Sequence, residues 1–259
     1  MEGLDDDEPE GNVLSNLNDE QYQDSVILCG PCGSGKSLLF HQLTKNSSDQ
    51  IGENGDKSIH TVMSLKANVN VVEGLRIVDY PGHITLSEKL PSLLLPQNTP
   101  TRAVFVVDST KSLSEAAVLL YRSVLTNPSV ANAWRKSGEV MKIMVACNKS
   151  DETGAKNWRR VKIQLRSELD KLKKISSSIE KGEGENSLVR DGDNAGEELF
   201  ELSGKTIDLD DLSKNGLEMM KLNFLSLSAK NGDGMKELEA FVTNGEVLTD
   251  NSSILKSRK

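Results

Sequence analysis

The sequence has few cysteines and no long apolar run. Only 3 of its 259 residues are cysteine, which is too few for a disulfide framework and indicates a reducing compartment. Cys29 and Cys32 have C-x-x-C spacing, but no second Cys/His pair accompanies them, so we expect no zinc site. No stretch approaches the roughly 18 consecutive apolar residues of a membrane-spanning helix, and the N-terminus lacks a signal-peptide pattern.

Signals for lipid attachment are missing as well. The second residue is Glu2, where myristoylation requires glycine, and the final residues from Lys256 to Lys259 contain no cysteine for prenylation. We therefore expect this chain by itself to be soluble, with membrane attachment only through a partner. The net charge is -8, so direct nucleic-acid binding is not expected either.

Composition divides the chain into one domain with tails. The first ten residues are strongly acidic without a helical or strand period, so we predict a disordered N-terminal tail over residues 1–23. The hydrophobic content of 36% suits one α/β domain, predicted over residues 24–244. Within it, residues 176–196 are rich in Ser, Glu, Gly, Asp and Asn and predict a mobile insert, and residues 245–259 form a C-terminal tail.

Strand and helix patterns alternate along the domain. Apolar, β-branched runs predict six strands, of which the second and third form a hairpin: 25–29, 62–72, 75–78, 102–108, 140–147 and 222–227. Apolar spacing of three and four residues predicts helices directly after Ser37 and over 113–125, 156–175 and 235–242. The basic face of the 156–175 helix is expected to be solvated, because no aromatic residues interleave it as in an RNA-binding surface. This order favours an α/β fold, a mostly parallel, doubly wound six-stranded sheet with helices on both faces.

A phosphate-binding motif connects the first strand to the first helix. Residues 30–37 match G-x-x-x-x-G-K-[ST], in which glycines allow backbone N–H groups to surround an anion at a helix N-terminus. Lys36 is predicted to reach the β- and γ-phosphates, and Ser37 to bind Mg²⁺. The residues expected to contact the nucleotide here are Gly30, Pro31, Cys32, Gly33, Ser34, Gly35, Lys36, Ser37 and Leu38.

Polar residues follow three other strands, at the edge where ligands of such sheets bind. Asp79 is placed to hold Mg²⁺ through water, and Gly82 brings a backbone N–H to the γ-phosphate. Alone, this Asp-x-Pro-Gly segment would be an ordinary turn; behind a phosphate loop it predicts a triphosphate sensor.

The other two polar segments predict selectivity for guanine. The carboxylate of Asp151 can accept hydrogen bonds from both the ring N–H and the amine of guanine, for which adenine has no equivalent pair of donors. Lys149 is expected to lay its alkyl stem along the base, and Asn148 to brace the phosphate loop. The later segment Ser228, Ala229 and Lys230 completes the pocket, with the Ala229 N–H offered to the guanine carbonyl oxygen.

With these four motifs in order, the chain resembles the Ras-like GTPases, which have the P-loop GTPase fold, and most closely the family of signal recognition particle receptor β subunits. The resemblance covers about residues 25–242 and is carried by Ser34–Phe40, Val78–His83, Val104–Asp108, Ala146–Lys149 and Ser228–Lys230. It implies a GTP- and Mg²⁺-dependent adaptor at the cytosolic face of the endoplasmic reticulum membrane. Its implied partner is the receptor α subunit, with the ribosome or the translocon as further contacts in co-translational targeting.

Two site residues and one alternative function stay open. The switch threonine that meets Mg²⁺ and the γ-phosphate is assigned to Thr61, with Ser58 as the alternative. His83 stands where many Ras-like enzymes have the water-positioning glutamine, so it is a candidate catalytic residue. Alternatively, it only packs in the switch segment, and hydrolysis is then slow. The alternative function is a cycling small GTPase of vesicle trafficking or translation, which the missing lipid signals and the lack of further domains disfavour.

Overall fold

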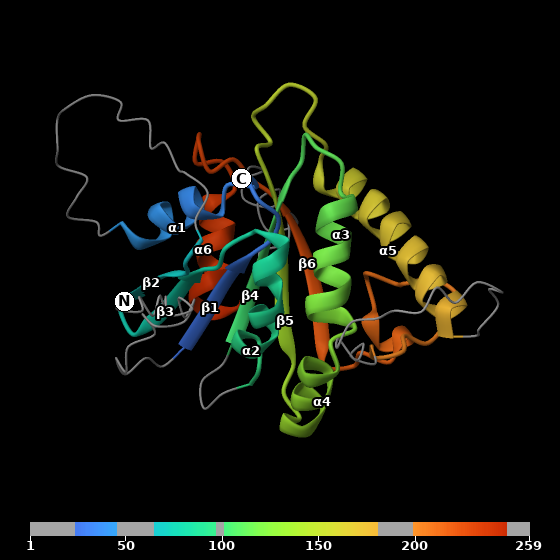
Figure 1. Cartoon of the computed structure of the whole chain (residues 1–259). Coiled ribbons are helices and arrows are strands. Elements are labelled where there is room, and N and C mark those ends of the chain that lie inside the picture. Colours follow the sequence, from blue (N-terminus) through green and yellow to red (C-terminus); the bar gives the residue numbers. More distant parts are fainter. Residues whose placement is uncertain (1–23, 46–64, 97–100, 181–198, 248–259) are drawn as a thin grey trace, which may run out of the picture.

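The computed structural model describes residues 24–45, 65–96, 101–180 and 199–247, and within them a six-stranded sheet forms the centre of the molecule (Figure 1). The strand order is β2-β3-β1-β4-β5-β6, and only β2 runs antiparallel to its neighbour. The bounds are β1 Asp24–Cys29, β2 Asn68–Val72, β3 Leu75–Asp79, β4 Thr101–Asp108, β5 Met141–Asn148 and β6 Met220–Ser226. The predicted α/β fold, mostly parallel and doubly wound, is confirmed.

Helices cover both faces of the sheet. Neighbouring residues of a strand point to opposite faces, and here both faces carry apolar side chains that the helices bury. Val26 and Leu28 face the layer of α1 (Lys36–Thr44) and α6 (Met235–Asn244), whereas Ile27 and Cys29 face the larger core on the other side. That larger core is covered by α2 (Leu90–Leu93), α3 (Ser114–Leu120), α4 (Pro128–Ser137) and α5 (Trp158–Glu180). No helix in these described ranges is long and apolar enough to cross a bilayer.

The second strand is shorter than predicted. β2 begins at Asn68, and residues 65–67, predicted to be strand, lie outside it. Its partner β3 ends at Asp79, which pairs with Asn68, and Pro81 then follows without a backbone N–H. Residues before Asn68 therefore have no ladder partner.

Helix α5 is longer than predicted and takes in the start of the predicted insert. Residues 176–180 form its last turn, where the Ser177 and Ser178 hydroxyls donate to the Lys174 carbonyl at 3.0 and 2.9 Å. Serine within a helix can bond back in this way to a carbonyl one turn earlier. Ile175, expected on the apolar face, is 57% exposed. Residues 181–196 of the predicted insert lie outside the described residues. The same is true of the N-terminal tail up to residue 23, of the chain from residue 248 onward, and of Ser58 and Thr61.

Several short helices were not predicted, although α4 carries clear boundary signals. Asn127 caps it by accepting the Val130 N–H at 3.2 Å, Pro128 takes the first helical position, and Gly138 ends it in the left-handed conformation. The predicted 113–125 helix instead stops at Leu120 and continues as a π-helix over Tyr121–Leu125. The unpredicted segments also include two 3₁₀ helices, η2 (Ile84–Lys89) and η4 (Leu212–Asn215).

The five parallel strands all end at one edge of the sheet. The last residues of these strands are Cys29, Asp79, Asp108, Asn148 and Ser226. The predicted phosphate and guanine motifs begin at or shortly after strand ends. Ligands of open α/β sheets bind at this edge. The candidate site is therefore built here.

Candidate guanine-nucleotide site

The loop between β1 and α1 has the backbone shape that an anion cradle needs. Gly30, Gly33 and Gly35 have φ angles of 132°, 71° and 95°, a range that residues with a Cβ rarely adopt. The Lys36 ammonium lies inside the loop and donates to the carbonyls of Gly30 and Pro31, each at 2.9 Å. Burial lowers the pKa of Lys36, while the charge of the nearby Asp79 opposes that shift.

Two of these glycines also allow the loop to lie against the sheet. A Cβ on Gly30 would come within 2.2 Å of the Val106 carbonyl oxygen, and one on Gly35 within 2.2 Å of Asn148 Nδ2. Real Cβ atoms do not approach that closely. The loop thus fits onto β4 and β5 only with glycine at both positions.

A hydroxyl and a carboxylate meet beside the loop, where Mg²⁺ was predicted. Ser37 Oγ donates to Asp79 Oδ2 at 2.7 Å, and Asn68 Nδ2 reaches the same oxygen at 3.2 Å. Asp79 is buried. Mg²⁺ prefers such hard oxygen ligands and takes its remaining ligands from water and phosphate. In the described ranges no group of three or more His, Cys, Asp or Glu is placed to hold a metal ion by itself.

The segment after Asp79 closes on the phosphate loop. A Cβ on Gly82 would lie 2.5 Å from Lys36 Nζ and 2.7 Å from the Cys32 nitrogen, so the two backbones touch. The next residue, His83, is exposed and caps the N-terminus of η2. Its Nδ1 accepts the Thr85 N–H at 3.4 Å and lies 2.7 Å from Thr85 Oγ1, so in this conformation the ring is engaged by its own turn.

Asn148 connects the phosphate loop to the other predicted guanine segment. Its Nδ2 donates to the Ser34 carbonyl at 2.8 Å, and its Oδ1 accepts the Ala229 N–H at 3.0 Å. Ser228 Oγ in turn donates to Asp151 Oδ1 at 2.6 Å, which orients that carboxylate. The Ala229 N–H was predicted to face a guanine carbonyl; in this conformation Asn148 takes it, because both lie at the ends of paired strands.

The remaining predicted contacts are less closely involved. Leu38 is partly buried and packs against the core beneath α1. Lys230 is exposed at the end of the last motif. Gln42, which the sequence analysis missed, donates to the Ala229 carbonyl at 3.2 Å and ties α1 to that motif.

A second missed residue, Asp108, lies at the end of β4. Its Oδ2 pairs with Lys149 Nζ at 2.7 Å, and its Oδ1 accepts both the N–H and the hydroxyl of Thr110 at 3.0 and 2.6 Å. Burial would raise the pKa of Asp108, but the hydrogen bonds from Lys149 and Thr110 outweigh it and hold the pKa below its ordinary value. The sequence carried no signal for this contact, because it depends on the register of β4 and β5, which pairs Asp108 with Asn148.

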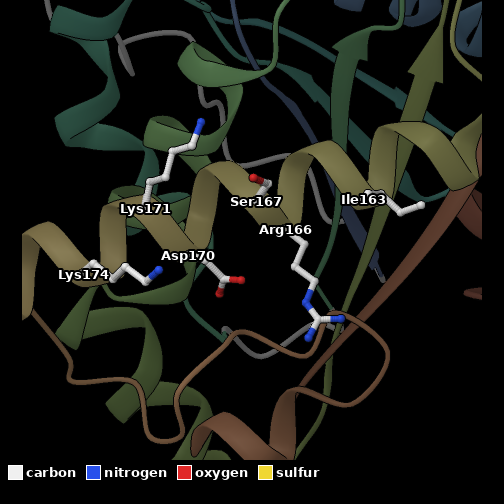
Figure 2. Close-up of a pocket in the computed structure, with 6 residues that line it drawn as sticks. All are labelled: Ile163, Arg166, Ser167, Asp170, Lys171 and Lys174. Carbon is white, nitrogen blue, oxygen red and sulfur yellow. The ribbon is translucent and has the colours of Figure 1, made fainter.

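A hollow on the outward side of α5 is separate from this site. Its described lining comes entirely from that helix: Ile163, Arg166, Ser167, Asp170, Lys171 and Lys174 (Figure 2). Figure 2 shows Arg166 and Asp170 directed toward the segment after residue 199, where they bond to Thr206 Oγ1 and to the Ile207 N–H. One helix face supplies no opposing wall, so we assign no site to it.

Comparison with known proteins relates the chain to one family of receptor subunits. The family model described as signal recognition particle receptor beta subunit matches residues 21–216. The signal recognition particle receptor subunit beta of Mus musculus is 27% identical over 215 residues, covering 82% of this chain and 71% of the mouse protein.

Two solved structures from Chaetomium thermophilum share the fold. The receptor protein SRb with GDP and Mg has a TM-score of 0.59 at 17% identity, covering 87% of this chain and 98% of that one. The SRb-GTP/SRX complex also gives 0.59 at 17% identity, covering 86% and 98%.

Proposed function

Because the chain belongs to the signal recognition particle receptor beta subunit family, we propose that it binds GTP with Mg²⁺ and, in that state, binds the receptor α subunit. The phosphates lie in the loop of residues 30–37, with Lys36 neutralising their charge. Ser37, Thr61 and, through water, Asp79 hold the Mg²⁺, which offsets further phosphate charge. Gly82 directs its N–H to the γ-phosphate.

Guanine is held by residues at the ends of β5 and β6. Asp151, oriented by Ser228, accepts the ring N–H and the amine of the base, and Lys149 covers one face of the ring. The Ala229 N–H is shared between Asn148 and the base carbonyl oxygen, while Lys230 closes the exposed side. A site built on such hydrogen bonds rejects adenine strongly.

The single observation that carries this proposal is the position of Asn148. One side-chain amide joins the phosphate loop at Ser34 to the last motif at Ala229, at 2.8 and 3.0 Å. Three motifs far apart in the sequence thus meet around one point. An ordinary glycine-rich turn, with no nucleotide to bind, would not require contacts to two other motifs.

The α subunit is proposed as the partner on two grounds. Family membership supports this partner. One of the solved structures with the same fold is that of an SRb-GTP/SRX complex. In this role GTP and Mg²⁺ order the segment around Thr61 and Asp79 so that a partner can bind, and the nucleotide acts as a condition for assembly. The cellular site is the endoplasmic reticulum membrane at its cytosolic face, with the ribosome or the translocon nearby during co-translational targeting.

Hydrolysis is proposed to be slow. His83 is the candidate for positioning the attacking water, but its ring is bonded to Thr85 in this conformation. A partner would have to turn it toward the phosphates.

The test is the nucleotide content of the purified chain, followed by single-turnover hydrolysis with and without the α-subunit N-terminal domain. We expect co-purified guanine nucleotide, slow intrinsic turnover and complex formation only with GTP. A chain that carries no guanine nucleotide and binds none when it is added contradicts nucleotide binding itself. Rapid intrinsic turnover without nucleotide-dependent affinity for that domain would instead identify a cycling GTPase with another partner.

A further inference from the structure

The carboxylate of Asp108 is fixed at the carboxyl edge of the sheet by contacts on both of its oxygens. The side chain is buried, and one oxygen accepts two hydrogen bonds from Thr110. Its other oxygen faces Lys149 Nζ at 2.7 Å. Because Thr110 lies only two residues further along the chain, rotation of the carboxylate would break both of these hydrogen bonds.

The lysine that meets Asp108 stands in an unusual backbone conformation. Lys149 has a φ of 64°, in the left-handed region that lysine rarely adopts. Its N–H donates to Asn148 Oδ1 at 2.8 Å, and the Asn148 carbonyl accepts from both the N–H and the hydroxyl of Ser109, at 3.0 and 2.6 Å. The turn after β5 is therefore clamped by the turn after β4.

Of the two lysines that pair with this carboxylate in the described ranges, Lys149 is held more closely. Lys111 Nζ is 3.8 Å from Asp108 Oδ2 and its side chain is 64% exposed, whereas the Lys149 side chain is 27% exposed. Exposed, longer ion pairs contribute little. Asp108 thus acts mainly on Lys149.

We propose that Asp108 is a positioning residue of the guanine site: it fixes the Lys149 ammonium so that the alkyl stem lies ready against the base. The inference rests on the proposed nucleotide-binding function. A free lysine stem has many rotamers, and ordering it on binding costs entropy. Because Asp108 anchors the ammonium, most of this entropy is already lost in the nucleotide-free protein, and ordering the stem costs less when the nucleotide binds. Asp108 itself makes no contact with the nucleotide.

The test is a double-mutant cycle on GDP affinity, using Asp108→Asn and Lys149→Met. The asparagine keeps the size of the side chain but presents no charge to the lysine. We expect Asp108→Asn to weaken GDP binding about 10-fold, equivalent to about 1.4 kcal/mol. In a Lys149→Met background the same change should have almost no effect, because there is no ammonium left to position.

Inosine diphosphate, which lacks the 2-amino group of guanine, separates an effect through Lys149 from a wider displacement of the guanine segment, which would also disturb Asp151. The Lys149 stem lies against the ring plane and not against the 2-amino group, so Asp108→Asn should weaken GDP and inosine diphosphate binding by the same factor. A matched cycle with Lys111→Met should show no coupling to Asp108. If Asp108→Asn does not fold, Thr110→Val loosens the same carboxylate, and its smaller loss should also vanish in the Lys149→Met background.

Additive effects of the Asp108 and Lys149 changes would overturn the proposal, as would an unchanged GDP affinity in Asp108→Asn. A change in the ratio of GDP to inosine diphosphate affinity would contradict it as well. If the unsubstituted chain binds no guanine nucleotide, the proposed function fails instead. The two failures are thus distinguishable.

Discussion

At the scale of single residues, base selectivity depends on the carboxylate of Asp151. Ser228 holds that carboxylate with a 2.6 Å hydrogen bond. We expect Asp151→Asn to lower GTP affinity by a factor on the order of 10² to 10⁴, because its amide cannot accept both guanine donors. The amide can instead donate to the C2 carbonyl of xanthine, so xanthosine triphosphate should bind better than GTP. Equilibrium titration with both nucleotides measures the reversal.

Ser228→Ala is the matched control for this prediction. It leaves both acceptor oxygens on Asp151 and removes only the orienting hydroxyl, so GTP affinity should fall by about 10-fold without a change of base preference. If Asp151→Asn kept its preference for GTP, the assignment of Asp151 to the base would be wrong.

The three cysteines should differ sharply in reactivity. Burial raises the pKa of Cys29 and of Cys147 to about 12 in each case, although Lys36 opposes the shift at Cys29. Thiols react as thiolates, so these two should resist iodoacetamide at pH 8 in the folded protein. Cys32, partly exposed in the phosphate loop, should be modified first, and bound GTP should slow its modification.

Peptide mass spectrometry of the labelled protein separates these sites, and labelling in urea should modify all three cysteines. Cys29 or Cys147 reacting as fast as Cys32 in the folded state would show that β1 and β5 open more readily than their burial implies.

At the scale of secondary-structure elements, the fit of the phosphate loop on β4 can be tested with two glycines. Gly30→Ala should destabilise the protein by several kcal/mol, about 3 or more, because its Cβ would lie 2.2 Å from the Val106 carbonyl oxygen. Gly138→Ala also places alanine at a positive φ, 72°, but nothing lies within 4 Å of its Cβ. It should cost only about 1 kcal/mol.

Urea unfolding of both variants gives the comparison. Equal losses of unfolding free energy would mean that backbone strain, rather than contact with β4, explains the need for glycine at residue 30.

The two sides of α5 allow a second comparison. Leu165 is fully buried and Ile163 is 70% exposed on the same helix. Leu165→Ala should lower the free energy of unfolding by about 2–5 kcal/mol, whereas Ile163→Ala should change it by about 0.5 kcal/mol or less. Thermal or chemical unfolding measures both. A large loss in Ile163→Ala would require a covering partner for the outward face of α5.

The elements that the sequence predicted well are those with strong apolar patterns. The buried runs of β4 and β5 were located within one residue at each end, and the 3.6-residue pattern of α5 was read correctly up to Leu172. α4 was missed because its apolar residues, Val130, Ala131 and Trp134, are few. The end of α5 was missed because its serines look like a loop in composition, while their hydroxyls bond back to Lys174.

At the scale of the whole molecule, the strand order brings the motifs to one edge, and motif spacing alone could predict that much. The motif led us to expect that Asn148 braces the phosphate loop, and its amide lies 2.8 Å from the Ser34 carbonyl, 114 positions away. What the sequence could not reveal is the Asp108–Lys149 pair, because it depends on the register of β4 and β5. Thr61 and Ser58 lie outside the described residues, so the choice between them stays a prediction.

The most direct test of a GTP-dependent adaptor is the affinity of the α-subunit N-terminal domain for this chain loaded with a non-hydrolysable GTP analogue or with GDP. Calorimetry with Mg²⁺ present would give both dissociation constants. We predict binding at least about 10-fold tighter with the GTP analogue, since each 1.4 kcal/mol of coupling gives a factor of ten. Equal affinity in the two states, or no binding in either, would contradict the account.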